Sequence, residues 1–369
     1  MYLFSTLKAL DNIKAAIRRK GADVLLVTQP ENRRYLSGFK APDLSIAESS
    51  GALLVFTRFS PLLLTDSRYQ LQAEQETTGF GVVLVQHNLW NTLLKILVRR
   101  NVLKLAFESH YFLHDAATKL MDLGQKHGIE IIPVSNMIEK QRTRKSGEEI
   151  QKISQSVLLN EKVFLEVYKG LRPGQTEKEV AQQIETAMRR NGAEEPAFST
   201  IVAAGPNAAQ PHAVPTDRAI KKGETVIIDM GLKLDGYCSD MTRTIVLGKP
   251  DSRTVKIIRL VRKAQRAALE TIKAGILARD ADRAAREIIS RAGYGKHFGH
   301  SLGHGVGLAV HEAPSLNKMR RNKLQPGMVV TVEPGIYLPG WGGVRLENMV
   351  AVTGDGCTIL NRDTTFLDI

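Results

Sequence analysis

The sequence predicts two domains: an α/β domain over residues 1–140 and an α+β domain over residues 141–369 that is built from two similar halves. Three observations lead to this prediction. The 369 residues exceed the length of one ordinary domain. Helical and strand-like segments alternate through the first 140 residues, which is typical of an α/β domain. After them, one glycine-bounded pattern occurs twice.

The first domain begins with apolar residues at helical spacing over 7–19, and Gly21 ends that helix before a strand at 22–27. We expect Pro30-Glu-Asn to form a turn. Residues 51–56 and 61–65 are two short strands, predicted to form a hairpin. A helix precedes the remaining segments, which are a strand at 81–86, a helix at 90–99, a strand at 104–108, a helix at 114–127 and a strand at 129–132.

A polar, charged stretch over 139–149 marks the domain boundary, and residues 149–168 form a long amphipathic helix. The internal repeat follows. The segments 174–192 and 275–293 each place one helix of equal length between two glycines. Further on, residues 222–231 align with residues 326–335, so two similar halves are expected to enclose one central site.

Both aligned segments place an acidic residue at the end of a buried strand, because Asp229 follows Gly223 at the distance at which Glu333 follows Gly327. A hairpin turn at Asp235-Gly236 is expected to bring Asp240 beside Asp229. The second half repeats this arrangement with Glu347, after a glycine-rich connection. Adjacent buried carboxylates repel one another and favour a bound cation. The alternative is that each acid merely pairs with one of the many lysines and arginines.

Residues 298–314 contain His300, His304 and His311 with four interspersed glycines. Glycine disfavours a helix, so we expect an irregular or extended segment that delivers imidazoles into a tight space. The alternative is a glycine-rich surface loop with incidental histidines. Four carboxylates and one imidazole would suit two divalent ions, with manganese, cobalt, iron or zinc favoured by the oxygen-rich ligand set. A water that bridges two such ions becomes a nucleophile at neutral pH.

These segments resemble the pita-bread dinuclear metallopeptidases, which include methionine aminopeptidase, Xaa-Pro aminopeptidase, Xaa-Pro dipeptidase (prolidase) and the metal-free creatinase. The motifs that carry the resemblance are Asp229 with Asp240, residues 300–314, residues 332–337 and residues 344–347. Residues 32–39 and 65–69 are similar to the creatinase/prolidase-type N-terminal domain. The resemblance covers the whole chain and implies the pita-bread fold for the second domain.

The resemblance also implies roles for single residues. The metal ligands would be Asp229, Asp240, His304, Glu333 and Glu347. Asp240 and Glu347 would bridge both ions, Asp229 would hold one ion, and His304 and Glu333 would hold the other. Glu333 would also carry the proton from the bridging water to the leaving amine.

Further residues match the substrate side of the family's site. His212 would be a catalytic histidine of the substrate pocket, although on its own it would be interpreted as structural. His311 would stabilise the tetrahedral intermediate. His300 would contact substrate, and Arg345 would support the pocket together with Tyr337. Two departures from the family's pattern are Asn348, where proline-specific members usually carry Asp, and the residues 209–211 before His212.

The complete ligand set argues against creatinase, and the additional N-terminal domain argues against methionine aminopeptidase. A proline-directed peptidase remains, since the bond before proline lacks an N–H and needs a dedicated pocket. We expect an Xaa-Pro aminopeptidase that hydrolyses peptides with proline in second position by means of two divalent ions, manganese first. The alternative is an Xaa-Pro dipeptidase that acts on dipeptides only.

The net charge of +13 would suit nucleic acid, an acidic membrane surface or acidic substrates. The basic clusters are short, and the densest of them, such as residues 318–323, are expected to be solvated surface, so neither nucleic acid nor membrane is expected as a partner. A family member that binds nucleic acid or protein without catalysis is the alternative, but such members generally lose metal ligands. Two cysteines, no apolar membrane span and no signal peptide indicate a cytoplasmic protein. The resemblance implies a homodimer.

Overall fold

The computed structural model describes residues 2–41, 51–86, 88–363 and 367, with the side chains of residues 2–8 left aside. The chain divides into two compact units, residues 1–142 and 143–369, and each is treated by itself. Within the described residues, no helix is both long and apolar enough to cross a membrane.

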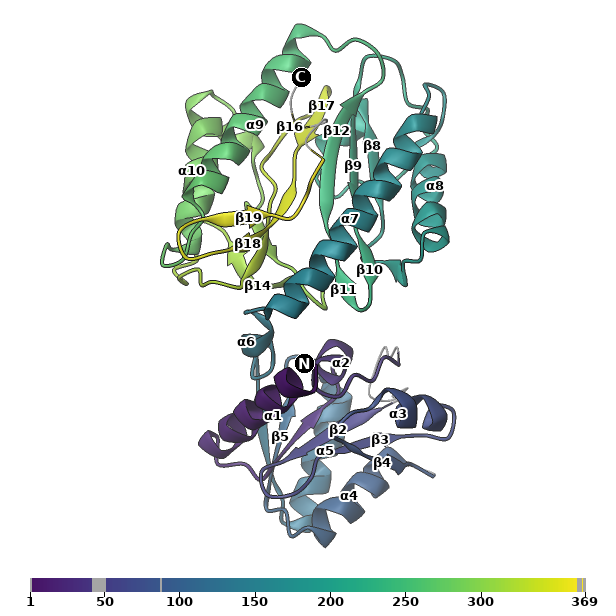
Figure 1. Ribbon diagram of the computed structural model, residues 1–369, viewed down its shortest axis with the longest axis vertical. Helices are drawn as coiled ribbons and strands as arrows, with labels where there is room; N and C mark the ends of the chain where they lie inside the picture. Colours follow the sequence, from purple (N-terminus) through teal and green to yellow (C-terminus); the bar gives the residue numbers. More distant parts are fainter. Residues whose placement is uncertain (1, 42–50, 87, 364–366, 368–369) are drawn as a thin grey trace. The chain divides into compact units, whose positions relative to one another are not determined.

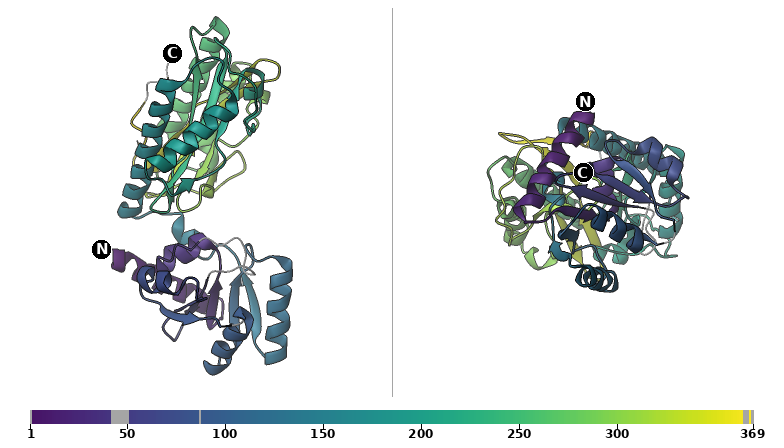
Figure 2. Two further views of the ribbon diagram at one scale, coloured as in Figure 1. Left: turned by 90° about the vertical axis from the view of Figure 1, so that its right-hand side faces the viewer. Right: turned by 90° about the horizontal axis from the view of Figure 1, so that it is seen from below.

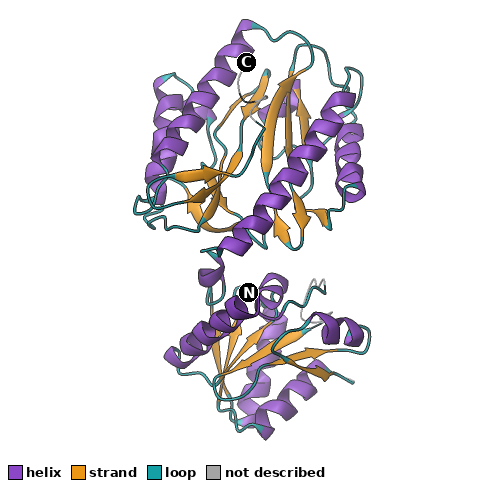
Figure 3. Cartoon of the chain, in the orientation of Figure 1, coloured by secondary structure: helices purple, strands orange, loops and turns teal. Residues whose placement is uncertain are grey.

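The first unit is a mixed sheet with helices on both faces (Figure 3). Its strand order is β4-β3-β2-β1-β5-β6, and the β2–β3 pair is the predicted hairpin. The strands are β1 (Val24–Val27), β2 (Ala52–Phe56), β3 (Leu62–Thr65), β4 (Gly81–Leu84), β5 (Lys104–Glu108) and β6 (Glu130–Val134). The helices are α1 (Tyr2–Arg19), α2 (Pro30–Ser37), α3 (Gln70–Glu76), α4 (Leu89–Arg99), α5 (His114–His127) and α6 (Glu139–Arg142).

Alternation along β1 builds two cores in this unit. Leu25 and Val27 pack in a cluster with α1, whereas Val24 and Leu26 pack in a cluster with α4 and α5. The predicted turn at Pro30 is wrong. Helix α2 begins there, because proline is well suited to the first turn of a helix, and Gly38 at φ 85° ends it.

The second unit contains strands between two pairs of helices, α7 with α8 and α9 with α10 (Figures 1 and 2). Its helices are α7 (Gly147–Gly170), α8 (Glu177–Arg190), α9 (Ser252–Thr271) and α10 (Ala278–Arg291), with 3-10 turns η1 (Gly205–Ala209) and η2 (Gly295–His297). Its strands are β7 (Glu195–Pro196), β8 (Ile201–Ala204), β9 (Thr225–Met230), β10 (Leu232–Leu234), β11 (Tyr237–Cys238), β12 (Met241–Val246), β13 (Gly303–Gly305), β14 (Glu312–Leu316), β15 (Val329–Val332), β16 (Gly335–Leu338), β17 (Gly342–Arg345), β18 (Asn348–Val352) and β19 (Cys357–Ile359).

The internal repeat is present in three dimensions. Helices α8 and α10 each have 14 residues and lie between glycines with positive φ. Each is followed by an antiparallel strand pair, β9 with β12 in the first half and β15 with β18 in the second. The predicted fold, an α/β domain followed by an α+β domain with an internal pseudo-two-fold repeat, is confirmed.

Two local predictions in this unit have different outcomes. The hairpin at Asp235-Gly236 is confirmed, with both residues at positive φ (46° and 82°) between β10 and β11. The single strand predicted over 236–246 is instead two strands, β11 and β12, which belong to different sheets. The break falls at Ser239 and Asp240, where the Ser239 hydroxyl bonds the backbone of Leu232.

Candidate active site

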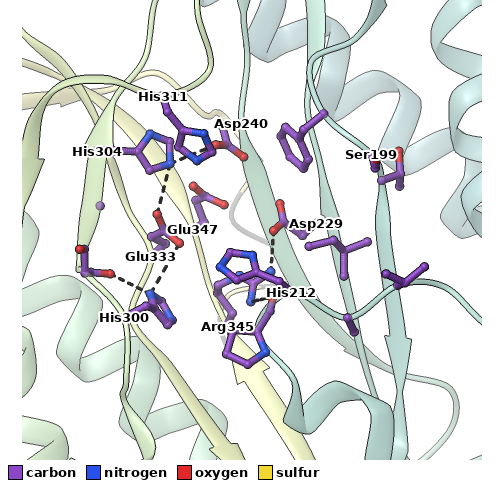
Figure 4. A pocket seen from close by; sticks show the side chains of 18 of the residues that line it. Ser199, His212, Asp229, Asp240, His300, His304, His311, Glu333, Arg345 and Glu347 are labelled. Atoms are coloured by element: carbon purple, nitrogen blue, oxygen red, sulfur yellow. Dashed lines mark hydrogen bonds and ion pairs between the residues drawn. The ribbon is translucent and has the colours of Figure 1, made fainter. Parts of the chain in front are cut away.

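The two halves of the second unit enclose a cavity of about 600 Å³ (Figure 4). Apolar side chains, among them Phe198, Ile201 and Val214, form part of its wall. The residues predicted to bind the metals or the substrate line this cavity: His212, Asp229, Asp240, His300, His304, His311, Glu333, Arg345 and Glu347. Tyr337, predicted to support the pocket, is not among the lining residues but contacts Arg345 and His300. The structure thus brings the whole predicted set together.

The four acids come from matched places in the strand pairs. Asp229 lies in β9, and Asp240 immediately precedes its antiparallel partner β12. Glu333 follows β15 and Glu347 precedes β18, and the pairing of Val332 with Asn348 sets these two acids opposite one another. The two antiparallel pairs therefore point all four carboxylates at the same space.

His304 is presented by β13, which is not helical and carries a bulge at His304. Its strand lies so close to β15 that a Cβ on Gly303 would stand 2.0 Å from the Thr331 carbonyl oxygen, so only glycine fits. The Nδ1 of His304 lies 3.1 Å from the Gly305 carbonyl oxygen and is assigned as the donor. Its Nε2 then offers a lone pair, 3.5 Å from Asp240 Oδ2 and 3.4 Å from Glu333 Oε1. This is the arrangement of a histidine metal ligand.

The clustered acids resist ionisation without a cation. Burial, followed by the charge of neighbouring acids, raises the pKa of Asp240 and of Glu347 well above the usual range. Burial also raises the pKa of Glu333 to about 8, although the Arg345 charge opposes that shift. Burial lowers the pKa of His304 to about 4, so its imidazole is neutral at physiological pH, as a ligand must be.

The residues present fit a divalent cation. Ligand atoms of Asp240, His304 and Glu347 all lie within 4.8 Å of one another. Asp229 Oδ2 accepts from Arg345 at 2.5 Å, whereas the buried Oδ1 has no hydrogen-bond partner among the described residues. An orphaned carboxylate oxygen is costly in a buried place, and a metal ion would satisfy it.

A polar network supports the floor of the cavity. The buried guanidinium of Arg345 donates to Asp229, to Tyr337 Oη (2.8 Å), to Thr242 Oγ1 (3.0 Å) and to the Pro211 carbonyl (3.0 Å). Thr242 in turn donates to Glu347 at 2.7 Å. Arg345 therefore holds carboxylates from both halves in place. Sequence reasoning missed Thr242, which has no signal beyond its place two residues after Asp240.

The three remaining histidines lie around this floor. His300 Nδ1 donates to the Ser301 carbonyl at 2.8 Å, so its Nε2 accepts from Tyr337 Oη at 2.9 Å. Burial lowers the pKa of His300 to about 4 and raises that of Tyr337 to about 12, which keeps both groups neutral. The rings of His304 and His311 are 4.3 Å apart, and His212 lies across the cavity (Figure 4).

Comparison with known proteins identifies the family. Residues 151–354 match Metallopeptidase family M24, and residues 10–144 match the Creatinase/Prolidase N-terminal domain. The chain belongs to family M24. It is a metallopeptidase of the pita-bread fold, in a family with proline-directed members, and the resemblance predicted from the sequence is confirmed.

Individual relatives match the peptidase over nearly all of its length. An Xaa-Pro dipeptidase of Pyrococcus horikoshii is 35% identical over 93% of this chain and 94% of its own. The solved structure of an Xaa-Pro dipeptidase from Bacillus anthracis is 35% identical, covers 99% of both chains and has a TM-score of 0.91. An X-Pro aminopeptidase from Thermotoga maritima is also 35% identical, covers 94% of this chain and 97% of its own, and has a TM-score of 0.86.

Sequence reasoning missed the residue that holds the His212 loop. Glu177 is the first residue of α8 and is fully buried. Its carboxylate accepts hydrogen bonds from the Ala204 amide at 2.7 Å and from the Asn207 side chain. It also accepts from the backbone amide of Thr216 at 3.0 Å and from the Thr216 hydroxyl at 2.6 Å. These contacts bracket the loop that carries His212. A glutamate at a helix start resembles ordinary capping, so no sequence signal singled it out.

The second half contains a comparable device on α10. Asp282, which is fully buried, pairs with Arg286 through two 2.8 Å contacts and accepts from the Leu302 amide at 3.1 Å. Arg286 also donates to the carbonyls of Phe298 and His300, each at 2.7 Å. The pair therefore fixes the backbone on both sides of His300.

Asn348, the departure from the proline-specific pattern, is 1% exposed. Neither polar atom of its side chain has a hydrogen-bond partner within the part of the chain that the structure describes. Asn348 pairs with Val332 in the β15–β18 ladder, directly beside Glu347 and Glu333. With asparagine at position 348, the predicted ligand Glu347 still lines the cavity.

We expect the metal-free peptidase to lose stability as pH rises from about 5 to about 8. The pKa of Glu333 is about 8 in the folded state and about 4.3 in an unfolded chain. The folded state therefore binds more protons between these values, and the unfolding free energy falls with rising pH. Urea unfolding in the presence of chelator, measured at several pH values in this window, checks this result.

Manganese should abolish the decrease, because the cation replaces the protons among the carboxylates. The variant Glu333→Gln should reduce the pH dependence of the metal-free protein without abolishing it, because the raised pKa values of Asp240 and Glu347 also contribute. A free energy of unfolding that rises with pH in the presence of chelator would contradict the raised pKa values.

Proposed function

We propose that this metallopeptidase is an Xaa-Pro dipeptidase that uses two divalent metal ions. The observation that carries the proposal is the cluster of Asp240, His304 and Glu347 in a cavity lined by three further histidines and an apolar wall. Relatives named Xaa-Pro dipeptidase or prolidase support the dipeptidase alternative over the aminopeptidase that we expected from the sequence. The aminopeptidase remains the second candidate, since one solved relative of equal identity carries that name.

In this proposal the ions are held by Asp229, Asp240, His304, Glu333 and Glu347, with manganese as the first expectation and cobalt, zinc or iron as alternatives. Bound ions would supply Lewis acidity and an activated water at neutral pH. His304 fits this role because its Nε2 faces Asp240 and Glu333 while the Gly305 carbonyl fixes its Nδ1. Asp229 fits because its buried Oδ1 has no hydrogen-bond partner among the described residues while Arg345 fixes its Oδ2.

The remaining roles fall to side chains of the cavity. Glu333 is suited to proton transfer, because its carboxyl group lines the cavity 3.4 Å from His304 Nε2 and burial raises its pKa. His311 lies beside His304 and can donate to a developing oxyanion. His212 and His300 would contact the substrate, and the Phe198 and Ile201 wall suits a proline ring.

The proposal includes a homodimer, which light scattering would test.

The test compares Ala-Pro, Ala-Pro-Ala-Ala and Ala-Ala as substrates, with chelator and with added Mn²⁺. We expect Mn²⁺-dependent release of alanine from Ala-Pro, at least about tenfold slower release from Ala-Pro-Ala-Ala, and none from Ala-Ala. Faster cleavage of the longer peptide would establish the aminopeptidase instead. Hydrolysis that chelator leaves unchanged would overturn the metal-dependent mechanism.

A further inference from the structure

A second cavity, of about 650 Å³, adjoins the catalytic one, and His300 and Ser301 line both. Its lining includes four cationic side chains, and no aspartate or glutamate is among its described lining residues. The four are Arg286, Lys296, Lys318 and Arg320. We call this cavity the basic groove. Two of its residues belong to the cluster at 318–323 that the sequence alone presented as solvated surface.

The four cations are not equivalent. Arg286 pairs with Asp282 and donates hydrogen bonds to the carbonyls of Phe298 and His300. Lys296, Lys318 and Arg320 are exposed, and over the described ranges of the chain none of the three side chains forms an ion pair. Three cations that form no ion pair on one cavity create a positive local potential that attracts anions.

The position of the basic groove decides which part of a peptide it can meet. An exopeptidase that removes one amino-terminal residue must admit the carboxyl-terminal remainder of its substrate, which is the only part of variable length. The free amino group of the substrate is positively charged and is repelled by the groove. Because His300 and Ser301 line both cavities, the carboxyl-terminal side is the part of the substrate that would pass from the catalytic cavity into the basic groove.

We propose that the basic groove binds carboxylates located beyond the second residue of the substrate, so that the peptidase also cleaves longer Xaa-Pro peptides when their carboxyl-terminal part is acidic. The inference rests on the proposed proline-directed function and deepens it by naming a second substrate class. Two sources supply the same chemistry, the terminal carboxylate and an acidic side chain.

The experiment measures kcat/KM of the Mn²⁺-loaded full-length protein on Ala-Pro-Ala-Asp and Ala-Pro-Ala-Lys, each as the free acid and as the carboxyl-terminal amide. We expect the Asp peptides to exceed the Lys peptides by about tenfold at low salt, and the ratio to shrink at about 0.5 M salt, because exposed ion pairs are screened. A ratio retained in the amides assigns recognition to the acidic side chain. A higher kcat/KM for the free acid than for the amide of the same peptide assigns it to the terminal carboxylate.

The triple variant Lys296→Ala/Lys318→Ala/Arg320→Ala should reduce the Asp-to-Lys ratio to within about twofold of one. Its kcat/KM for Ala-Pro should stay within about twofold of the unmodified enzyme, because none of the three residues lines the catalytic cavity. The matched control Lys169→Ala/Arg189→Ala/Lys222→Ala removes the same charge elsewhere and should keep the ratio.

Three outcomes would each overturn the inference while Ala-Pro is still hydrolysed. They are failure to cleave any of the long peptides, an Asp-to-Lys ratio near one together with equal kcat/KM for free acids and amides, and preferences that are unchanged in the groove variant. Loss of Ala-Pro hydrolysis in the unmodified enzyme would instead overturn the proposed function. The two failures are thus distinguishable in one set of assays.

Discussion

Replacement of Asp240 by alanine is expected to lower kcat/KM for Ala-Pro by about 10³-fold or more. Asp240 is 5% exposed and lies among three other acids, and its carboxylate is 3.5 Å from His304 Nε2. Loss of a ligand shared by both proposed ions would remove several kcal/mol of transition-state stabilisation, and about 4 kcal/mol corresponds to 10³-fold. Steady-state kinetics in excess Mn²⁺ measures the loss.

Metal content per protein chain, determined by elemental analysis after gel filtration, should fall in the same variant. Asp217→Ala is the matched control, since that aspartate forms only an exposed pair with Lys178 and should leave both measurements unchanged. Full metal content together with substantial activity in Asp240→Ala would exclude the proposed bridging role.

Glu177→Ala should destabilise the peptidase by about 3–5 kcal/mol, because the buried donors of Ala204, Asn207 and Thr216 lose their common acceptor. Urea unfolding of the metal-loaded protein checks this. Glu179→Ala on the same helix is the contrast: Glu179 is an exposed capping residue, and its loss should cost about 1 kcal/mol.

A positioning role for Glu177 predicts a kinetic effect as well. Under conditions in which the Glu177→Ala variant is folded, KM for Ala-Pro should rise more than kcat falls, since the loop that it fixes carries His212 on the cavity wall. If the variant is destabilised but has the same KM for Ala-Pro as the unmodified enzyme, the role of Glu177 is structural only.

Several elements were predictable because their causes are local. The glycines that bound α8 and α10 adopt positive φ, which other residues avoid, so their spacing revealed the repeat. The Asp235-Gly236 turn required the same backbone conformation. The acids at the ends of buried strands were informative for a similarly local reason. A carboxylate next to a buried apolar run must be paired or bind a cation, so its position in the sequence already indicates a site.

Other features depend on partners that are distant in sequence. Arg345 reaches Asp229 and the Pro211 carbonyl, and the Arg286 guanidinium bonds carbonyls in a different segment. The spacing of apolar residues indicates helices and strands but not contacts between distant segments. The hydrogen bonds that support the site therefore could not be predicted from the sequence. The misjudged turn at Pro30 has another origin, because the proline that opens α2 is equally suited to a turn.

The pairing of acids from both halves has a consequence for how this unit folds. Asp229 and Asp240 belong to one half, Glu333 and Glu347 to the other, and the Glu347 amide donates to the Thr242 carbonyl between them. A fragment containing either half alone would expose an apolar sheet face and two mutually repelling carboxylates. Neither half should therefore be recoverable as an independently folded fragment, whereas the two expressed as separate chains should reassociate when a divalent cation is supplied.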